Sequence, residues 1–301
     1  MEYSELQKLN PDIIMVSSTG YGFDGPWANF GATGPATEGA SGLAYSTGYK
    51  NGPPVMSEIP YTDYTGAEHT IFAIMAALIH RQTTGDGQFI DVSQTETSTA
   101  TIPEFLMDYS ANKRVSSRNG NEDPSISPQG CYPCMGDDRW IVISITNDEE
   151  WASLCIELNN SELTSDTRFS TNEGRMKHKQ DIDDLIGRET LQWDNQELMK
   201  VLQTAGVPAG AVLDGQELLF NEHLKSRNFY EIVPHHPTTG MPPLPYAGRP
   251  WQFSTTPHVE PKAAPIMGEH NKSIFIDLLG YDESILEAVS NTHLRAHETL
   301  R

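Results

Sequence analysis

Asp63 is the residue of this 301-residue chain best placed to do chemistry. It lies in the segment Tyr61-Thr62-Asp63-Tyr64-Thr65-Gly66, ahead of a long apolar stretch. Thr65 and Glu68 have the spacing of a capping box, which predicts a helix that begins at Gly66. Asp63 then lies two residues upstream of the N-cap, where the positive end of the helix dipole favours an ionised carboxylate and its use as a nucleophile. The alternative is a structural role, in which Asp63 only supplements the cap.

Cysteine and histidine are the other residue types to consider for site chemistry. Cys131 and Cys134 form a C-x-x-C pair, and Cys155 is the third cysteine. Because three cysteines do not make a disulfide framework and there is no second C-x-x-C, the pair is predicted to be structural. His235-His236 and the other histidines lack the spacing of metal ligands. We therefore expect no metal site.

Segments on both sides of Asp63 carry a family resemblance. Upstream lie Ser41-Gly42-Leu43, Thr47-Gly48 and Gly52-Pro53-Pro54; downstream, Ala76-Ala77-Leu78-Ile79-His80-Arg81 runs into Thr84-Gly85-Asp86-Gly87-Gln88. In this order the segments resemble the class III CoA-transferases, the family of formyl-CoA transferase, carnitine CoA-transferase and α-methylacyl-CoA racemase. Asp63 falls on the catalytic Asp of that family, with eight residues between it and Pro54. The resemblance covers about residues 3–285.

The resemblance implies an acyl-CoA:carboxylate CoA-transferase. In the family, the Asp carboxylate attacks an acyl-CoA thioester to give a mixed anhydride, and the CoA thiolate then gives an aspartyl-CoA thioester. Acyl-CoA and a carboxylic acid are thus the expected partners, and coenzyme A enters as a substrate, with no permanently bound cofactor. We assign substrate-binding or CoA-binding roles to Glu38, Tyr61, Tyr64 and Gly66. For Glu38, which lies near the usual Gln of the family, the alternative is a solvated loop charge.

Departures from the family pattern leave two other functions to weigh. Racemase relatives place a His where this chain has Thr33, and deprotonation next to a thioester needs two groups of suitable pKa. A 2-methylacyl-CoA racemase is therefore the weaker alternative. Several transferases carry Tyr and an acid where Thr33 and Gly34 stand here, and the glycine run of the formyl-CoA transferases is missing, which argues against oxalate or formate. The second alternative is a truncated, non-catalytic subunit.

The charge of the chain limits its partners. Twenty basic and 41 acidic residues give a net charge of −21, which argues against nucleic acid. CoA is itself a polyanion, so its site must depend on local Arg, Lys or backbone N–H groups. No apolar run has transmembrane length, and the N-terminus does not read as a signal peptide. We expect a cytoplasmic protein that does not bind membranes.

The elements that must position Asp63 follow from hydrophobic periodicity. A buried strand is predicted at residues 13–18, a helix from Gly66 to Thr83 that is apolar on nearly all sides and hence buried, a C-cap at Gly85 and a strand at residues 89–92. The intervening loop, residues 20–60, is long enough to suggest a function, or contains a short helix around residues 37–47. Further on, the pattern predicts a strand at residues 140–146, a helix at 147–158 capped by Asn147 or Asp148, and helices around 173–187 and 195–205.

These elements predict a mixed α/β chain with two units. The resemblance refines this to part of a large open, Rossmann-like α/β domain plus a smaller α+β domain, in an interlocked homodimer. We assign residues 1–115 to the remainder of the large domain with the catalytic Asp, and residues 116–128 to a linker. The small domain is assigned to residues 129–235 and a C-terminal return segment to 236–288.

Both ends of the chain depart from the resemblance. Relatives carry a nucleotide-binding segment ahead of residue 1, so we expect either a fragment or a partner that supplies it, and poor CoA binding by the isolated chain. Residues 289–301 do not resemble the family ending and are predicted to be a non-native tail, the alternative being an ordinary polar terminal helix.

Overall fold

The computed structural model describes residues 2–285, and its helices and strands alternate in a mixed order that confirms the α/β fold class. The chain divides into two compact units, Met1–Val212 and Leu213–Arg301. Within the first unit we distinguish the Asp63 region, residues 2–112, from the β3–β5 region, residues 129–212. The predicted tail at 289–301 lies outside the described residues. No helix among residues 2–285 is both long and apolar enough to cross a membrane.

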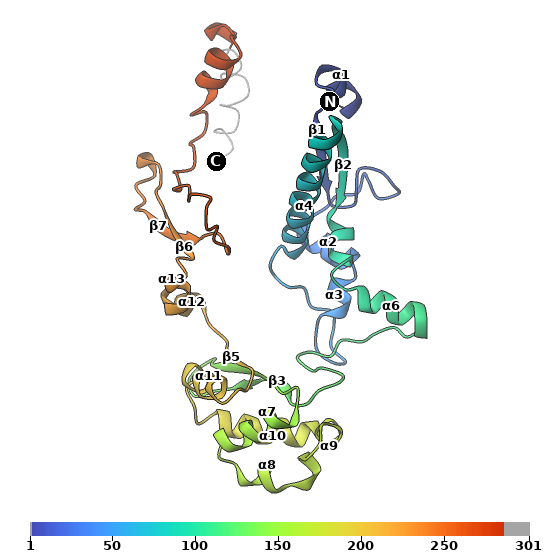
Figure 1. Ribbon diagram of the computed structural model, residues 1–301, viewed down its shortest axis with the longest axis vertical. Helices are drawn as coiled ribbons and strands as arrows, with labels where there is room; N and C mark the ends of the chain where they lie inside the picture. The colour runs from blue at the N-terminus through green and yellow to red at the C-terminus, as the bar shows by residue number, and fades with distance from the viewer. Residues whose placement is uncertain (1, 286–301) are drawn as a thin grey trace. The chain divides into compact units, whose positions relative to one another are not determined.

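Two parallel strands anchor the Asp63 region (Figure 1). β1 (Ile14–Thr19) pairs with β2 (Gln88–Ser93), with Thr19 opposite Ser93 at their carboxyl ends. The strands predicted at residues 13–18 and 89–92 are therefore confirmed, but the burial expected for the first is wrong, because the residues of β1 are half-buried or exposed. The connection between them carries α2 (Gly34–Ala40), α3 (Leu43–Ser46) and α4 (Tyr61–Thr84), while α1 (Tyr3–Leu9) precedes β1, and α5 (Gln94–Thr99) and α6 (Pro103–Asn112) follow β2.

The helix that carries Asp63 begins earlier than predicted. The first residue of α4 is Tyr61, with Pro60 at the N-cap, so the predicted start at Gly66 is wrong. Thr65 does not cap the helix, because its Oγ1 lies 2.9 Å from Oγ of Ser98 on α5. The capping-box spacing is local, whereas this hydrogen bond joins residues 33 positions apart. Asp63 therefore lies inside the first turn of α4, not ahead of it.

α4 ends where predicted but is less buried than predicted. Gly85 follows the helix at φ 83°, a left-handed conformation that glycine adopts without strain, which confirms the C-cap. The expected burial is wrong for the described residues: Ile71, Phe72 and Ile79 are 61%, 77% and 61% exposed, and Ala77 is the buried apolar residue of the helix. This exposed apolar face runs along the helix that carries Asp63.

The β3–β5 region combines a small sheet with several helices. β3 (Gln129–Pro133), β4 (Trp140–Ser144) and β5 (Ala209–Ala211) form an antiparallel sheet in the order β3-β4-β5. α7 (Asp148–Glu157) confirms the helix predicted at 147–158, and the Asn147 side chain caps it by accepting a hydrogen bond from the backbone N–H of Glu150. The other helices are α8 (Ser161–Ser165), η1 (Thr167–Phe169), α9 (Asn172–Lys177), α10 (Lys179–Thr190) and α11 (Asn195–Thr204).

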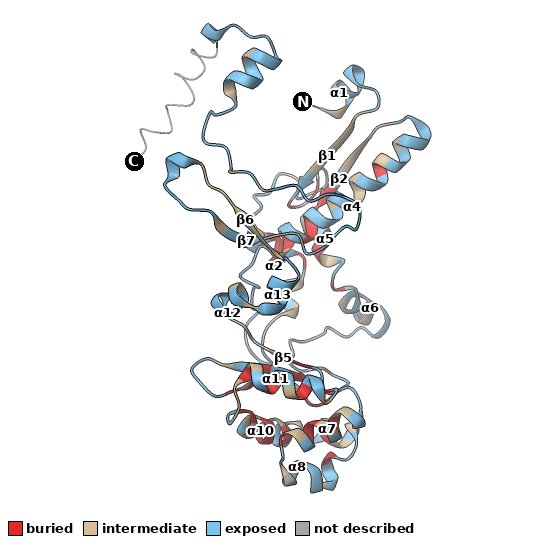
Figure 2. Ribbon diagram, turned by 60° about the vertical axis from the view of Figure 1, so that its left-hand side comes forward, coloured by how far each residue is buried: buried red, intermediate tan, exposed pale blue. Residues whose placement is uncertain are grey.

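A continuous apolar core holds the β3–β5 region together, and its buried positions gather on α7, α10 and α11 (Figure 2). Burial alternates along β4, where Ile141 and Ile143 are buried between exposed neighbours, as expected for a strand with one face on the core. Leu154, Ile182 and Leu198 add fully buried side chains from the three helices. This region therefore has the hydrophobic interior of a small domain.

Residues 113–128 contain no helix or strand. The second unit consists of short elements: α12 (Gly215–Phe220), α13 (Glu222–Ser226), β6 (Tyr230–Val233), η2 (Pro237–Thr239), β7 (Leu244–Ala247) and the π-helical η3 (Lys272–Leu278). β6 and β7 pair antiparallel, with Tyr230 opposite Ala247. The domain ranges assigned from the sequence stay predictions.

Candidate active site

The carboxylate of Asp63 is exposed in the first turn of α4. Its Oδ1 accepts a hydrogen bond from Nε2 of Gln94 at 2.8 Å. Its Oδ2 faces Gly34, since a Cβ atom built on that glycine would lie 3.6 Å from this oxygen. One oxygen is thus held by an amide, and the other lies beside a glycine that has no side chain. The N-terminus of a 24-residue helix is also a favourable place for a negative charge.

Gln94 is the residue next to Asp63 that the sequence analysis missed. It is the first residue of α5, directly after Ser93 ends β2 and caps α5 by accepting a hydrogen bond from the backbone N–H of Glu96. Since β1 and β2 are parallel, Gln94 lies at the carboxyl edge of the strand pair, where ligand sites of α/β proteins are found. A polar residue directly after a buried strand is the signal that would have identified it.

Gly66 is what allows Gln94 to lie so close to α4. A Cβ atom on Gly66 would come within 3.0 Å of Cγ of Gln94, closer than side chains normally pack. The missing side chain therefore makes room for the Gln94 stem beside the helix that carries Asp63. The binding role predicted for Gly66 stays a prediction.

Buried hydroxyl groups fix the first turn of α4 from two sides. Oγ1 of Thr62 lies 2.7 Å from Oγ1 of Thr37 on α2. On the other side, Oγ1 of Thr65 lies 2.9 Å from Oγ of Ser98 on α5. All four side chains are buried. Because Asp63 lies between Thr62 and Thr65 in sequence, its direction is set by contacts with α2 and α5.

No acid or base stands at positions 33 and 34, beside Asp63. Thr33 is the N-cap residue of α2, and Gly34 is the first residue of that helix. Gly34 contributes space next to Oδ2 of Asp63. Neither Thr33 nor Gly34 therefore supplies a second titratable group beside the Asp63 carboxylate, as expected from the sequence.

Glu38 is buried, so its reading as a solvated loop charge is wrong. Its side chain is 3% exposed. Oε1 accepts a hydrogen bond from the backbone N–H of Ser57 at 2.9 Å, and Oε2 accepts one from Oγ of Ser57 at 3.0 Å. Glu38 thus ties the segment that leads into α4 to α2. The substrate-binding role assigned to it stays a prediction.

The two tyrosines beside Asp63 have different environments. Tyr61, the first residue of α4, is half-buried, whereas Tyr64 is 61% exposed. Both are near enough in sequence to border a substrate at Asp63. Their predicted binding roles stay predictions.

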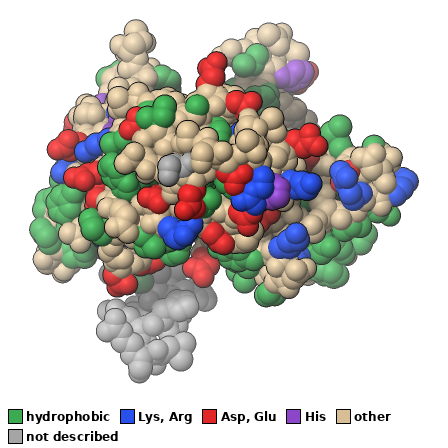
Figure 3. All heavy atoms as spheres, turned by 90° about the horizontal axis from the view of Figure 1, so that it is seen from below, with side chains coloured by type: hydrophobic (Ala, Val, Ile, Leu, Met, Phe, Trp, Pro, Cys, Tyr) green, Lys and Arg blue, Asp and Glu red, His purple; other side chains and the backbone are tan. Residues whose placement is uncertain are grey.

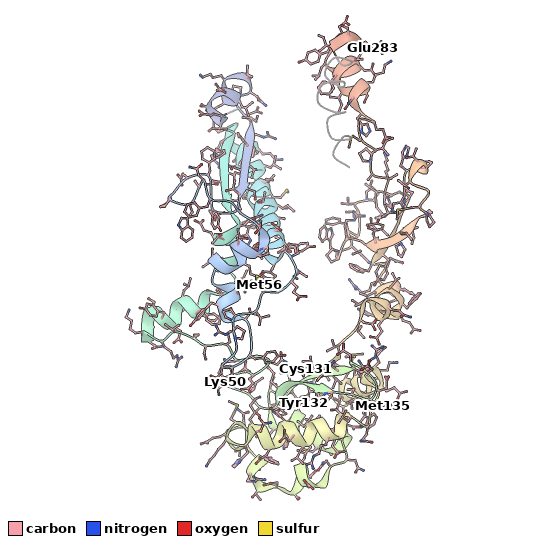
Figure 4. The ribbon with its side chains drawn as sticks, turned by 180° about the vertical axis from the view of Figure 1, so that it is seen from behind. Lys50, Met56, Cys131, Tyr132, Met135 and Glu283 are labelled. Carbon is pink, nitrogen blue, oxygen red and sulfur yellow. The ribbon has the colours of Figure 1, made fainter. Side chains whose placement is uncertain are left out.

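A separate cavity of about 1080 Å³ opens beside β3. Lys50, Cys131, Tyr132, Asp183 and Arg188 are among the residues that line it, and Asp63 is not. Figure 4 shows Cys131 and Tyr132 next to each other on β3. The Tyr132 hydroxyl donates to Oδ1 of Asp183 at 2.7 Å, and burial raises the pKa of both groups. The tyrosine therefore stays a neutral donor at neutral pH.

The cysteines belong to the fold of the β3–β5 region. Cys134 and Cys155 are buried in its core, and Cys131 is half-buried. Burial raises the pKa of Cys134 to about 11 and that of Cys155 to about 12, so both are neutral thiols at neutral pH. Within residues 2–285, no cluster of three or more His, Cys, Asp or Glu side chains is arranged to hold a metal ion.

The overall field opposes a polyanionic substrate. Asp and Glu side chains are spread over the face drawn in Figure 3, in keeping with the net charge of −21. The groups that hold Asp63 in place are neutral: an amide and several hydroxyls. The phosphates of CoA would have to find local cations or backbone N–H groups.

Comparison with known proteins points to one family. The sequence matches the family model described as CoA-transferase family III over residues 1–271. It is 30% identical over 278 residues to a protein named succinate–glutarate CoA-transferase from Agrobacterium fabrum, covering 92% of this chain and 68% of the relative. It is 31% identical over 284 residues to succinyl-CoA–D-citramalate CoA-transferase from Chloroflexus aurantiacus, covering 94% and 70%.

A solved structure agrees with these sequence matches. The crystal structure of a CAIB/BAIF family protein from Brucella suis superposes on this chain with a TM-score of 0.81 at 27% identity. The superposition covers 92% of this chain and 71% of that chain.

Proposed function

Since the chain belongs to CoA-transferase family III, we propose that it moves CoA between carboxylic acids through covalent intermediates on Asp63. Membership makes it a CoA-transferase with CoA thioesters as substrates; the role of Asp63 and the intermediates are the proposal. One observation supports it above all. Asp63 offers an exposed carboxylate with Oδ1 held by Gln94 and space beside Oδ2.

The first half-reaction loads CoA onto the enzyme. Oδ2 of Asp63 attacks the acyl carbon of acyl-CoA, the C–S bond breaks, and a mixed anhydride and CoA thiolate form. The thiolate attacks Cγ of Asp63, and the bond from Cγ to the bridging Oδ2 breaks. The first acid leaves as its carboxylate and an aspartyl-CoA thioester remains. One difficult transfer is thereby divided into easier steps.

The second half-reaction returns CoA to a new acid. The acceptor carboxylate attacks Cγ of the thioester and expels CoA thiolate. A new anhydride between Asp63 and the acceptor is left. The thiolate then attacks the acyl carbon that came from the acceptor, and the Asp63 carboxylate leaves. Each step exchanges one nucleophile for one leaving group, so the cycle needs no added oxidant or metal.

The first substrates to test are succinyl-CoA as donor and glutarate as acceptor. One relative is named a succinate–glutarate CoA-transferase, and another a succinyl-CoA–D-citramalate CoA-transferase. A racemase would need a second acid–base group beside Asp63. Thr33 and Gly34 occupy the positions where such a group stands in relatives. We therefore do not propose racemase activity.

The working assembly proposed for this chain is a homodimer. Exposed apolar side chains on α4 and α6 support it, including Phe72 at 77% and Met107 at 69% exposure, since contiguous exposed apolar surface marks interfaces. Light scattering at two protein concentrations would test it, with twice the chain mass expected. A monomer mass at both concentrations would refute the dimer.

Substitution of Asp63 tests the nucleophile. The protein is incubated with succinyl-CoA, quenched and digested, and mass spectrometry should find CoA on the Asp63 peptide. Asp63→Asn should abolish the adduct and lower kcat by at least about 10⁴-fold, because a neutral amide cannot form the anhydride. Asp86→Asn, in the turn that follows the same helix, is the control and should keep wild-type activity. An adduct that survives Asp63→Asn excludes Asp63 as the nucleophile.

A further inference from the structure

Gln94 touches the atom on which negative charge forms when CoA reacts with the enzyme. Its Nε2 lies 2.8 Å from Oδ1 of Asp63. We propose that Gln94 is a catalytic residue whose amide stabilises the oxyanion on Oδ1 each time Cγ of Asp63 is attacked. This inference rests on the proposed function, because it requires covalent intermediates at Asp63.

The chemistry follows from which oxygen is held. With Oδ1 bound to Gln94, the free Oδ2 is the oxygen that attacks the acyl carbon and becomes the bridging oxygen of the anhydride. Oδ1 is then the carbonyl oxygen at Cγ. When thiolate attacks Cγ, the electron pair of that carbonyl moves to Oδ1; it returns when the bond from Cγ to Oδ2 breaks and the first acid leaves with Oδ2.

The same group acts in the return step. The acceptor carboxylate attacks Cγ of the thioester, the electron pair again moves to Oδ1, and it returns as the C–S bond breaks. In an oxyanion hole, the donor lies about 2.7–3.1 Å from the developing oxyanion and is oriented before the reaction. The Gln94 amide meets this description. The attack of Oδ2 on the acyl-CoA places its oxyanion on the substrate oxygen instead. Gln94 should therefore matter for the steps at Cγ and little for the first step.

The fold holds Gln94 in this orientation. Its backbone starts α5, fixed by the Ser93 cap, and its stem occupies the space left by Gly66. The hydroxyl pair of Thr65 and Ser98 holds α4 against α5 at 2.9 Å. Gln94 and Asp63 thus come from two helices, α5 and α4. The spacing of these helices is set by other side chains, Thr65 and Ser98.

Gln94→Met tests the proposal, because methionine is unbranched and of similar length but has no amide donor. Single turnovers of the native protein with succinyl-CoA are quenched at intervals, and the Asp63 peptide is assayed for acyl and CoA adducts. We expect the acyl adduct to form within about threefold of the wild-type rate and the CoA adduct to form about 10²–10³-fold more slowly, the usual cost of losing an oxyanion donor. In the steady state kcat should fall by the same factor, with the KM of glutarate little changed.

Gln94→Glu is the second variant, since it keeps the shape of the side chain and replaces the donor by a carboxylate. It should show the same slow step. Gln180→Met is the matched control: the Gln180 amide also donates to an aspartate, Oδ1 of Asp184 at 2.9 Å, but on the exposed surface of α10. That control should leave both steps unchanged.

The possible results separate the two proposals. If wild-type Asp63 carries neither adduct, the proposed function is wrong and this inference falls with it. If Asp63 is labelled but Gln94→Met and Gln94→Glu form the CoA adduct at the wild-type rate, only the role of Gln94 is overturned. If both steps slow equally, Gln94 orients Asp63 without stabilising the oxyanion, which also overturns the proposal.

Discussion

Buried side chains are mostly apolar in the β3–β5 region and mostly polar in the Asp63 region. Every member of the main core cluster falls between Tyr132 and Ala209. The Asp63 region buries few apolar side chains; they are Ala44, Ala77, Val92 and Ile102. Its buried polar side chains are Thr37, Glu38, Ser41, Thr62, Thr65, Ser93, Thr95, Thr97 and Ser98. The part of the molecule that carries the candidate nucleophile is thus the part with the weaker hydrophobic interior.

The difference separates stability from geometry. Burying a large apolar side chain contributes about 1.5–3 kcal/mol, whereas a typical internal hydrogen bond contributes about 0.5–1.5 kcal/mol net. Hydroxyl pairs such as Thr62 with Thr37 are directional, so they define where the first turn of α4 lies. They supply little stability, and the exposed apolar face of α4 shows where more burial would have to come from.

The largest expected effect comes from separating the two regions. A fragment of residues 121–212 should fold alone and unfold cooperatively, with a stability of about 5 kcal/mol, because it contains the whole core cluster. A fragment of residues 1–112 should show no cooperative transition and should bind a hydrophobic dye. Thermal unfolding followed by circular dichroism, together with dye fluorescence, measures both.

Two exposed residues provide the control for this experiment. Replacing Phe72 and Ile79 of α4 by serine in the 1–112 fragment should lower dye binding without restoring a transition, since these side chains are exposed. A cooperative transition in the 1–112 fragment would contradict the contrast between the regions. So would an unfolded 121–212 fragment.

Arg175 shows how the β3–β5 region treats a buried charge. The side chain is fully buried, and its guanidinium lies 5.2 Å from the Trp151 ring. It donates to the carbonyl oxygens of Ser127 and Phe169 at 2.9 and 3.1 Å, and to Oδ1 of Asp148 at 2.7 Å. One side chain thereby joins the end of the linker to the helical layer.

Arg175→Met should destabilise the chain by about 2–4 kcal/mol, because two buried carbonyl groups lose their donor. The Asp148 side chain is 65% exposed, so water can solvate the charge left behind and the loss stays below that of a fully buried pair. Denaturant unfolding measures it as a lower midpoint at constant slope. Arg188→Met is the control: its contact with Glu162 is exposed on both sides at 3.8 Å and should change stability by less than about 0.5 kcal/mol. Equal losses of stability in Arg175→Met and Arg188→Met would contradict the idea that burial makes Arg175 important for the stability of this region.

The sequence predicted those elements whose signals are local. The Asn147 cap needs the N–H of Glu150, three residues away, and Gly85 needs only its own backbone conformation. The strand β1 follows from the continuous apolar run at residues 13–16, typical of parallel strands, and β2 from the short segment at residues 89–92 after the glycine turn. Asp63 itself was identified by its neighbours in sequence, and its catalytic role stays a prediction.

The errors and the omission involve partners distant in sequence. Thr65 has a capping pattern, but its hydroxyl meets Ser98, 33 residues away. Glu38 looks like a loop charge until Ser57, 19 residues away, supplies its two donors. Gln94 lies 31 residues from Asp63, and no spacing rule links a glutamine after one strand to an aspartate in the first turn of a helix. The sequence gives residue types, whereas the pairing of α4 with α2 and α5 is decided by packing.

The two regions also differ in how they hold a carboxylate, as Asp63 and Asp183 show. Asp63 is exposed and accepts from an amide, whereas Asp183 accepts from the Tyr132 hydroxyl with its side chain 26% exposed. Burial is the largest cause that raises the pKa of Asp183, ahead of the opposing effects of Tyr132 and Lys179. In the β3–β5 region, the ionised Asp183 beside the cavity therefore lowers the stability of the folded state.

The smallest expected effect is the pH dependence of that cost. The pKa of Asp183 is higher in the folded chain than in the unfolded chain, so the folded state binds more protons between the two values, and stability falls as pH rises from the ordinary aspartate range through the raised value. Asp183→Asn keeps an oxygen for Tyr132 but removes the charge. Its stability relative to wild type should therefore increase from pH 4 to pH 7, by about 1.4 kcal/mol for each pKa unit of the shift. Urea unfolding of both proteins at several pH values measures this difference, with Asp137→Asn, at an exposed position on another segment, as the control for loss of one charge. Parallel curves for wild type and Asp183→Asn would show that the cavity beside β3 imposes no such cost.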